Sequence, residues 1–280
     1  MISATAQAKI NITLEVLKKR ADGYHEIRSI VQTIDFCDKL SFKAGSRTEI
    51  ICNLPEWSSS KSLVSKAVDL LRNTSGLRQG VVIEIEKHIP LNSGMGGDSS
   101  DAAAVLRGLN LLWGLKLSIR DLLALAAQLG SDVSLFLYGG TLLVEGRGDK
   151  VRPLRPLPHA TVVLLMPPLP RLENKTRILY SQLNINHYTY GRATEDFVKM
   201  LEGREVGKNF GMFNVFDTVG MRYFAGLKEY RGKFIEAGAV DIHLTGSGPT
   251  LFTLLQDEVK ANAIHKKLQA QGLEACVASF

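Results

Sequence analysis

The chain is poor in the residues that cross-link proteins or bind metals, with three cysteines and six histidines among 280 residues. Cys37, Cys52 and Cys276 are widely spaced and odd in number, which excludes a disulfide framework and a Cys-x-x-Cys metal site. The histidines show no His-Glu-x-x-His spacing, so we do not expect a zinc enzyme. We expect the cysteines to act as small buried hydrophobic residues.

Long apolar runs are also missing. No run approaches the roughly 20 apolar residues that a membrane-spanning helix needs. The first residues lack the basic start and apolar centre of a signal peptide. With 45% hydrophobic and 22% charged residues, the chain can still bury a sizeable core. We therefore expect a cytoplasmic protein with no membrane partner.

Aromatic residues make up only 7% of the chain, and they do not alternate with arginines as RNA-stacking platforms do. The net charge is +6, but the basic residues are dispersed and the run at 18–20 is short. A positive balance suits small anionic ligands as well as nucleic acids, so charge alone does not choose between them. We expect a phosphorylated small-molecule ligand and no nucleic-acid partner.

Four familiar nucleotide-binding patterns are absent: Gly-x-x-x-x-Gly-Lys-Ser/Thr, Gly-x-Gly-x-x-Gly, His-Arg-Asp and Asp-Phe-Gly. Glycine and serine are nevertheless concentrated at 90–101, between a predicted strand over 81–86 and a predicted helix over 101–113. Glycines let backbone N–H groups approach a phosphate, and the following helix adds the positive end of its dipole. We interpret the segment as a phosphate loop; the alternative is a flexible connection whose serines cap a helix.

Strands and helices are mixed along the chain without strict alternation. Alternation over 8–14 predicts a strand with one buried face, and Ser118 with Asp121 predicts a capping box before a helix over 122–129. A proline cluster at 153–158 predicts a domain junction. We therefore predict an α+β protein with two domains, 1–155 and 156–280. Other strands are expected over 27–36, 140–146, 161–166, 240–244 and 250–255 and near 276, and other helices over 60–71 and 258–271.

A second glycine segment, 246–250, lies between two predicted strands. Alone it is more typical of a tight hairpin, but beside the first segment it becomes a candidate wall of one phosphate site.

Asp132 precedes an apolar run, where its simplest role is to cap the next element. Lys9 alone would be a solvated lysine on a strand. Together, Asp132 and Lys9 supply the carboxylate and the cation that hydroxyl phosphorylation needs.

Tyr24 and His25 follow the turn-forming pair Asp22-Gly23. They fit a surface turn. They fit equally well a site for a planar base, in which an aromatic ring stacks and a second ring forms hydrogen bonds.

These segments together resemble the GHMP kinases, a superfamily of small-molecule kinases whose pattern Pro-x-x-x-Gly-Leu-Gly-Ser-Ser is similar to residues 90–100. The likeness runs in family order over nearly the whole chain. It is closest to the branch whose substrate is a cytidine diphosphate sugar-alcohol, because Ala-Lys-Ile-Asn at 8–11 and Asp-Gly-Tyr-His at 22–25 are specific to that branch. Gly-Ser-Asp-Val at 130–133 and the segment 246–250 complete the match.

The resemblance implies a two-lobed GHMP kinase fold, with an N-terminal lobe like domain 2 of ribosomal protein S5 and a ferredoxin-like C-terminal lobe. It implies that ATP, accompanied by Mg²⁺, phosphorylates a substrate hydroxyl in the cleft between the lobes. The sequence names no Mg²⁺ ligands. We expect a monomer or a weak homodimer.

The resemblance also assigns roles to individual residues. Lys9 and Asp132 are implied as the catalytic pair. The residues implied to bind ATP are Lys87, Pro90, Leu91, Asn92, Ser93, Gly94, Met95, Gly96, Gly97, Asp98, Ser99 and Ser100. Those implied to bind the second substrate are Asn11, Tyr24, His25, Thr176, Tyr180, Gly246, Ser247 and Gly248, with Tyr24 and Tyr180 on the two faces of the cytosine and His25 at its edge.

The chain departs from the family pattern at several positions. Asp98 replaces a usual glycine and puts a negative charge inside an anion-binding loop, so we expect its carboxylate to point away from the phosphates or to engage Mg²⁺. Ser134 replaces a usual proline and Thr245 a usual serine. Asn-Val-Phe-Asp at 214–217 replaces Asn-Asp-Leu-Glu, which leaves Asn214 without an assigned role.

Two other functions fit less of the sequence. A kinase of the same superfamily that acts on a different alcohol gives no role to Tyr24 and His25. An RNA-binding module would fit the S5-like lobe and the positive charge, but it leaves both glycine segments without a purpose.

Overall fold

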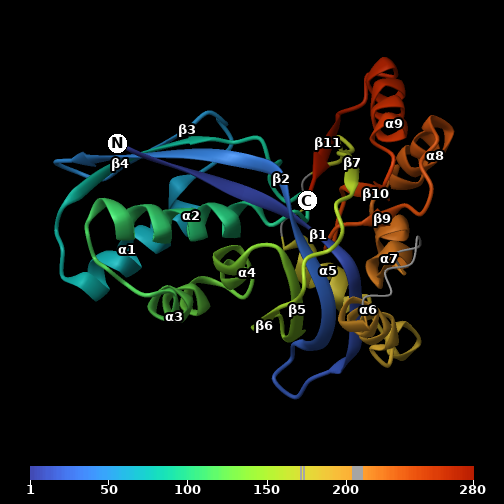
Figure 1. The fold of residues 1–280 in the computed structure, drawn as a ribbon, viewed down its shortest axis with the longest axis horizontal. Helices are drawn as coiled ribbons and strands as arrows, with labels where there is room; N and C mark the ends of the chain where they lie inside the picture. The colour runs from blue at the N-terminus through green and yellow to red at the C-terminus, as the bar shows by residue number, and fades with distance from the viewer. Residues whose placement is uncertain (171, 173, 204–210) are drawn as a thin grey trace. The chain divides into compact units, whose positions relative to one another are not determined.

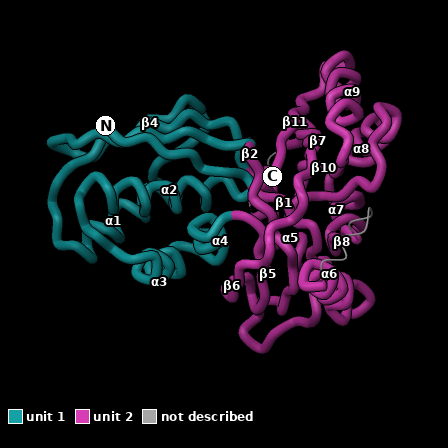
Figure 2. The backbone as a smooth tube through the Cα atoms, viewed as in Figure 1, with its two compact units in different colours: residues 1–8, 36–91, 96–139 teal, residues 9–35, 92–95, 140–280 magenta. Residues whose placement is uncertain are grey.

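The computed structural model describes residues 1–170, 172, 174–203 and 211–280. The chain forms two compact units (Figure 2), and each combines a sheet with helices. Unit 1 contains residues 1–8, 36–91 and 96–139, and unit 2 contains residues 9–35, 92–95 and 140–280. The α+β class predicted from the sequence is confirmed. The domain bounds 1–155 and 156–280 stay a prediction, and the compact units do not share them because strands β1 (Ile2–Lys19) and β2 (His25–Gly45) contribute residues to both units.

Unit 1 is a sheet with helices on one face (Figure 1). The helices are held close: a Cβ on Gly108 of α2 would lie 2.5 Å from the ring of Phe42 on β2, so only glycine fits there. The strand order is β3-β4-β2-β1. The other elements of this unit are β3 (Glu49–Cys52), η1 (Ser59–Lys61), α1 (Leu63–Ser75), β4 (Gly80–Glu86), α2 (Gly97–Leu112), α3 (Ile119–Leu129) and α4 (Val133–Tyr138).

Local sequence signals explain several of these bounds. The capping box of Ser118 and Asp121 forms as predicted at the start of α3. Helix α1 begins after Ser62, whose side chain accepts a hydrogen bond from the Val64 N–H. Helix α2 begins at Gly97, four residues before the predicted start, so the end of the glycine-rich segment is already its first turn.

Strands β1 and β2 continue into unit 2 in the same seven-stranded sheet, where β2 pairs with β5, β5 with β6, and β1 with β8. A second sheet of four strands belongs to unit 2 alone, in the order β11-β7-β10-β9. The core of unit 2 gathers residues of β1, the second sheet and the helices that follow. The elements are β5 (Thr141–Gly146), β6 (Lys150–Pro153), β7 (Thr161–Leu165), α5 (Lys175–Ser181), η2 (Ile185–His187), α6 (Arg192–Gly203), β8 (Phe213–Asn214), α7 (Phe216–Tyr223), α8 (Leu227–Ala237), β9 (His243–Leu244), β10 (Leu251–Leu255), α9 (Glu258–Ala270) and β11 (Ala275–Ser279).

Two expectations about burial are wrong. Residues 8–16 of β1 are all buried, although alternation predicted one solvated face. Helix α6 covers the polar side: Thr13 hydrogen-bonds Thr194 at 2.8 Å, and Glu15 accepts from the Thr194 N–H at 2.8 Å. The three cysteines lie on strands β2, β3 and β11 and are partly exposed rather than buried.

Candidate active-site residues

The two glycine segments meet inside unit 2. Gly94 has a φ of +89°, and a Cβ on it would collide with the carbonyl oxygen of Thr245 and lie 3.0 Å from the amide nitrogen of Gly248. The Thr250 N–H donates to the Ser93 carbonyl at 3.3 Å. The segment at 246–250 therefore links β9 to β10, as a hairpin would, and also packs against 92–95. The two interpretations of this segment, a hairpin and a wall of the phosphate site, are therefore compatible.

Lys9 and Asn11 of β1 are placed at these turns. The backbone of Lys9 donates to the Met95 carbonyl at 3.0 Å, and its ammonium donates to the Asn11 side chain at 2.6 Å. The same Asn11 oxygen accepts from the Gly246 N–H at 2.9 Å. Lys9 is only 5% exposed, and a Cβ on Gly246 would lie 2.9 Å from its nitrogen. Lys9 is therefore a buried cation against a glycine turn, which is a chemical setting suited to an anion.

Asn214, which the sequence left without a role, holds the second glycine turn in place. Its amide nitrogen donates to the carbonyl oxygens of Leu244 at 2.7 Å and Gly246 at 2.9 Å. Its amide oxygen accepts from the Phe216 N–H at 2.9 Å. A short β8 strand pairs with β1 and brings this side chain to the turn. The contacts join residues about 30 positions apart, so no local pattern could have revealed them.

Four of the residues expected to bind the second substrate form two contacting pairs. The Thr176 and Ser247 hydroxyls are 3.1 Å apart. The His25 ring stacks on Tyr180 with ring centres 5.1 Å apart. Burial lowers the pKa of His25, with a smaller contribution from Lys19, which favours the neutral ring that can both donate and accept hydrogen bonds.

Tyr24 makes a different contact from its neighbour. Its ring is 56% exposed, and the Arg147 guanidinium lies 5.4 Å from the ring centre. The structure thus pairs Tyr24 with Arg147 and His25 with Tyr180. The cytosine-stacking roles of Tyr24 and Tyr180 stay predictions.

The second half of the glycine-rich segment starts helix α2 in unit 1. Gly96, at the N-cap, has a φ of +76°, and Gly97 to Ser100 form the first turn. Backbone N–H groups in the first turn of a helix have no partner within the helix, and they lie at the positive end of its dipole. This turn therefore has the chemistry to hold a phosphate.

Asp98 lies in that first turn, but its carboxylate is engaged elsewhere. It accepts hydrogen bonds from the Ser62 hydroxyl at 2.7 Å and from the Leu63 N–H at 3.1 Å. These groups start helix α1, so the carboxylate caps α1 and offsets its dipole. This arrangement accounts for a negative charge inside the glycine-rich segment. Binding of ATP by Asp98 itself stays a prediction.

Lys87 is buried in an ion-pair cluster. Its ammonium donates to Asp101 at 2.6 Å and also to Asp38, and all three side chains are almost fully inaccessible. Asp38 also accepts from the His88 and Ile89 N–H groups at 2.6 and 2.8 Å. Burial raises the pKa of Asp101 to about 8, against the attraction of Lys87. The ammonium of Lys87 therefore ties β2 and α2 to the residues just before Pro90, and it lies against Gly97, where an added Cβ would be 3.2 Å from it. Binding of ATP by Lys87 stays a prediction.

Asp132 occupies the N-cap position of α4, but its side chain makes no capping hydrogen bond. The capping role that seemed simplest from the sequence is therefore wrong. The side chain is partly exposed, and it lies between the end of α3 at Leu129 and the buried start of α4 at Val133. Its carboxylate remains available for chemistry.

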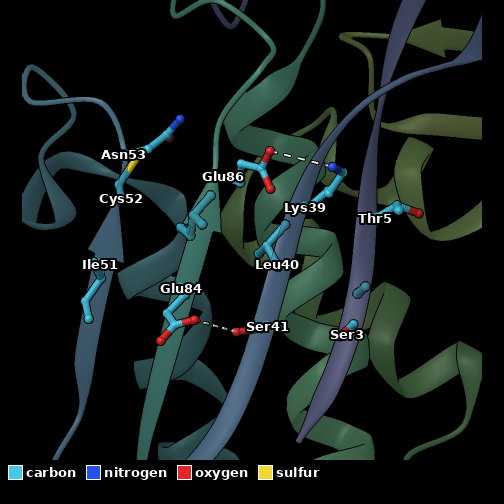
Figure 3. A pocket seen from close by; sticks show the side chains of 12 residues that line it. Ser3, Thr5, Lys39, Leu40, Ser41, Ile51, Cys52, Asn53, Glu84 and Glu86 are labelled. Atoms are coloured by element: carbon cyan, nitrogen blue, oxygen red, sulfur yellow. Dashed lines mark hydrogen bonds and ion pairs between the residues drawn. The ribbon is translucent and has the colours of Figure 1, made fainter.

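A hollow of about 740 Å³ lies on the outer face of the unit 1 sheet (Figure 3). Its polar lining is paired across strands: Lys39 lies 3.6 Å from Glu86, and the Ser41 hydroxyl donates to Glu84 at 3.2 Å. None of the residues predicted for catalysis or binding lines it.

Among the residues described, no group of three or more His, Cys, Asp or Glu could hold a metal, and no helix is long and apolar enough to cross a membrane.

Comparison with known proteins gives consistent matches over the whole chain. The family model "GHMP kinases N terminal domain" matches residues 62–140, and "GHMP kinases C terminal" matches residues 199–273. A 4-diphosphocytidyl-2-C-methyl-D-erythritol kinase of Dehalococcoides mccartyi is 45% identical over 281 residues, which covers 100% of this chain and 98% of the relative.

Solved structures agree with these matches. A crystal structure of 4-(cytidine 5'-diphospho)-2C-methyl-D-erythritol kinase superposes with a TM-score of 0.84 at 29% identity, covering 99% of this chain and 98% of that one. The homoserine kinase of Cytophaga hutchinsonii superposes with a TM-score of 0.71 at 21% identity, covering 99% of this chain and 94% of that one, which shows a shared fold only.

Proposed function

The chain belongs to the GHMP kinases, and on that basis we propose that it transfers the γ-phosphoryl group of ATP to the 2-hydroxyl of 4-diphosphocytidyl-2-C-methyl-D-erythritol. This reaction is a step in the non-mevalonate route to isoprenoid precursors. The observation that carries the proposal is 45% identity over the full chain with a relative that is named for this kinase activity.

The residues at the glycine turns supply the means to hold phosphates. Backbone N–H groups of the 94–97 segment and the first turn of α2 would bind the nucleotide phosphates, and the ammonium of Lys9 would offset charge on the transferred group. Asn11 and Asn214 fix the Gly246 turn beside Lys9. Phosphoryl transfer needs little covalent chemistry from a protein, so positioning and charge should supply most of the acceleration.

Asp132 is the proposed general base. The attacked hydroxyl is tertiary and weakly acidic, so a carboxylate that takes its proton would lower the barrier. Mg²⁺ is proposed to accompany ATP and to neutralise charge on its phosphates. At phosphoryl-transfer sites Mg²⁺ usually keeps several water ligands and binds the substrate phosphates together with one or two carboxylates.

An ADP-release assay that compares alcohols tests the proposal. We expect turnover with the cytidyl substrate and none above background with homoserine or mevalonate. Faster turnover with either of those alcohols would contradict the assignment.

The matched variant Asp132→Asn keeps the side-chain shape and removes the base. We expect kcat to fall by about 10²–10⁴ while ADP binding is retained. Near-normal kcat in this variant would remove Asp132 from the role.

A further inference from the structure

Lys175 is a buried lysine that joins the two glycine turns of unit 2. It is the first residue of α5 and is only 7% exposed. Its amino group donates to the Asn92 carbonyl at 2.8 Å and to the Gly248 carbonyl. Both acceptors belong to turn residues with left-handed backbone, φ +58° at Asn92 and +70° at Gly248. One side chain therefore fixes the first glycine turn to the second.

Among the residues that the structure describes, no carboxylate compensates the charge of this lysine. Within the described part of unit 2, no carboxylate lies within ion-pairing distance of Lys175. Burial lowers its pKa to about 7, and the charge of Lys9 on β1 contributes to that shift. The two turns contribute carbonyl oxygens and the Ser247 hydroxyl, and Arg177 on α5 itself is exposed. The amino group is thus easily deprotonated.

The two protonation states of the Lys175 amino group need different numbers of hydrogen-bond acceptors. A neutral amine has two hydrogens, and the two turn carbonyls accept both of them. An ammonium has a third donor, which needs a further acceptor if it is to stay buried. The backbone of Gly94 lies against the Gly248 carbonyl, and Lys9 lies against the neighbouring Gly246 in the same turn. An anion at the turns would supply that acceptor, and it would also favour the charged form of the lysine.

We propose that Lys175 is a further ligand-binding residue of the site at the two glycine turns, and that it takes up a proton when a diphosphate group binds there. The inference rests on the proposed function, because both reactants of that kinase, ATP and the cytidyl substrate, carry phosphates in a chain. Lys175 then serves two purposes: it positions the turns in the free enzyme and binds the anion in the complex. Both reactants contain a nucleoside diphosphate group. ADP is the probe for the group in ATP, and CDP is the probe for the group in the cytidyl substrate.

Calorimetric titration of the full chain with ADP and with CDP tests the proposal. Each titration is run at pH 6 and pH 8 in two buffers that differ in ionisation enthalpy, so that protons taken up on binding can be counted. At pH 8, about nine tenths of Lys175 is neutral when its pKa is about 7. We expect uptake that approaches one proton per bound diphosphate at pH 8 and much less at pH 6, for at least one probe.

Two variants test whether Lys175 is the group that takes up the proton on binding. Lys175→Arg keeps the charge and the donors but cannot lose its proton near neutral pH, so it should bind without the uptake. Lys175→Met keeps the length of the stem without donors, so it should bind at least about ten-fold more weakly, also without uptake, because it loses a charge-assisted hydrogen bond to the anion. If Lys175→Met fails to fold, the comparison of the wild type with Lys175→Arg decides.

The outcomes separate this inference from the kinase assignment. Binding by the wild type without proton uptake, or full uptake in either variant, overturns the role of Lys175 and leaves the kinase proposal standing. If the wild type binds neither ADP nor CDP, both proposals are overturned. The probe that shows the uptake identifies the reactant whose diphosphate lies at the turns.

Discussion

At the scale of single residues, Tyr24 is an aromatic side chain whose function can be tested without disturbing the core, because its ring is 56% exposed. If it stacks on the cytosine, Tyr24→Ala should raise KM for the cytidyl substrate by about ten- to hundred-fold, since stacking is worth about 1–3 kcal/mol per base. We expect kcat to change little. Steady-state kinetics with varied substrate measure both quantities.

Tyr190 offers a matched control for this experiment. It is an 89% exposed tyrosine that also has an arginine over its ring, with Arg192 6.0 Å from the ring centre. Tyr190→Ala should leave KM unchanged. An unchanged KM in Tyr24→Ala, or an equal rise in both variants, would contradict stacking by Tyr24.

Short patterns singled out residues that lie at the glycine turns, whereas contacts between distant residues could not be predicted; the catalytic and binding roles stay predictions. Lys9 and Asn11 were assigned from four consecutive residues, and both lie at the Gly246 turn. Asn214 and Lys175 were missed because their contacts with the turns join residues 30 to 83 positions apart. The capping role of Asp98 likewise depends on Ser62, 36 positions away.

At the scale of elements, the buried cluster of Lys87, Asp38 and Asp101 ties α2 to strand β2 and to the residue that follows β4. Lys87→Met should lower the free energy of unfolding by about 3–5 kcal/mol, because it removes the buried cation and hydrogen-bond donor that the carboxyl groups of Asp38 and Asp101 share. The control is Lys39→Met on β2, whose exposed pair with Glu86 should contribute about 1 kcal/mol or less. Urea unfolding of both variants gives the comparison, and equal losses would show that the buried cluster stabilises the fold no more than an exposed ion pair does.

The contact between the glycine turns can be tested with a single methyl group. Gly94→Ala should lower kcat/KM by at least about ten-fold, because its Cβ would collide with the Thr245 carbonyl and force the two turns apart. Gly114→Ala is the control for backbone strain alone, since Gly114 also has a positive φ, +62°, but a Cβ added there would meet no atom within 4 Å. Activity in Gly94→Ala that matches Gly114→Ala would mean that this close approach does not serve catalysis.

The types of the helices and strands were largely predictable from the sequence, but their bounds and the long-range contacts between them were not. The helix at 258–270 and the capping box at 118–121 follow from local pattern. Strand 240–244 shrinks to His243–Leu244, because β9 pairs with β10 over only two residues. That the turns at 94 and 246 pack together is a long-range contact, which no local signal in one sequence encodes.

At the scale of the whole molecule, His243 gives stability a definite dependence on pH. Burial opposes its charge, but Asp217 and Asp241, at 2.6 and 2.9 Å, outweigh that and raise its pKa. The folded state therefore binds a proton more tightly than the unfolded state, so the stabilisation is complete below about pH 6.5 and is lost as pH rises through the folded pKa. His243→Gln should cost more free energy of unfolding at pH 5.5 than at pH 9.

Urea unfolding at the two pH values measures this difference. His187→Gln is the control, because His187 is a histidine beside Asn184 rather than a carboxylate. Its cost should not depend on pH in the same way. A cost of His243→Gln that is equal at both pH values would contradict the ion-pair explanation.

The interleaved make-up of the two units limits how this enzyme can be divided. Residues 9–35 belong with the unit that also contains residues 140–280, so cutting the gene at the boundary after Gly139 separates Lys9 and Asn11 from the Gly246 turn that they contact. Neither half of such a split would carry a complete set of partners for its own core. Split-enzyme reporters or transplanted halves made at this junction should therefore work only when both pieces are supplied together, and each expressed alone should be insoluble or unfolded.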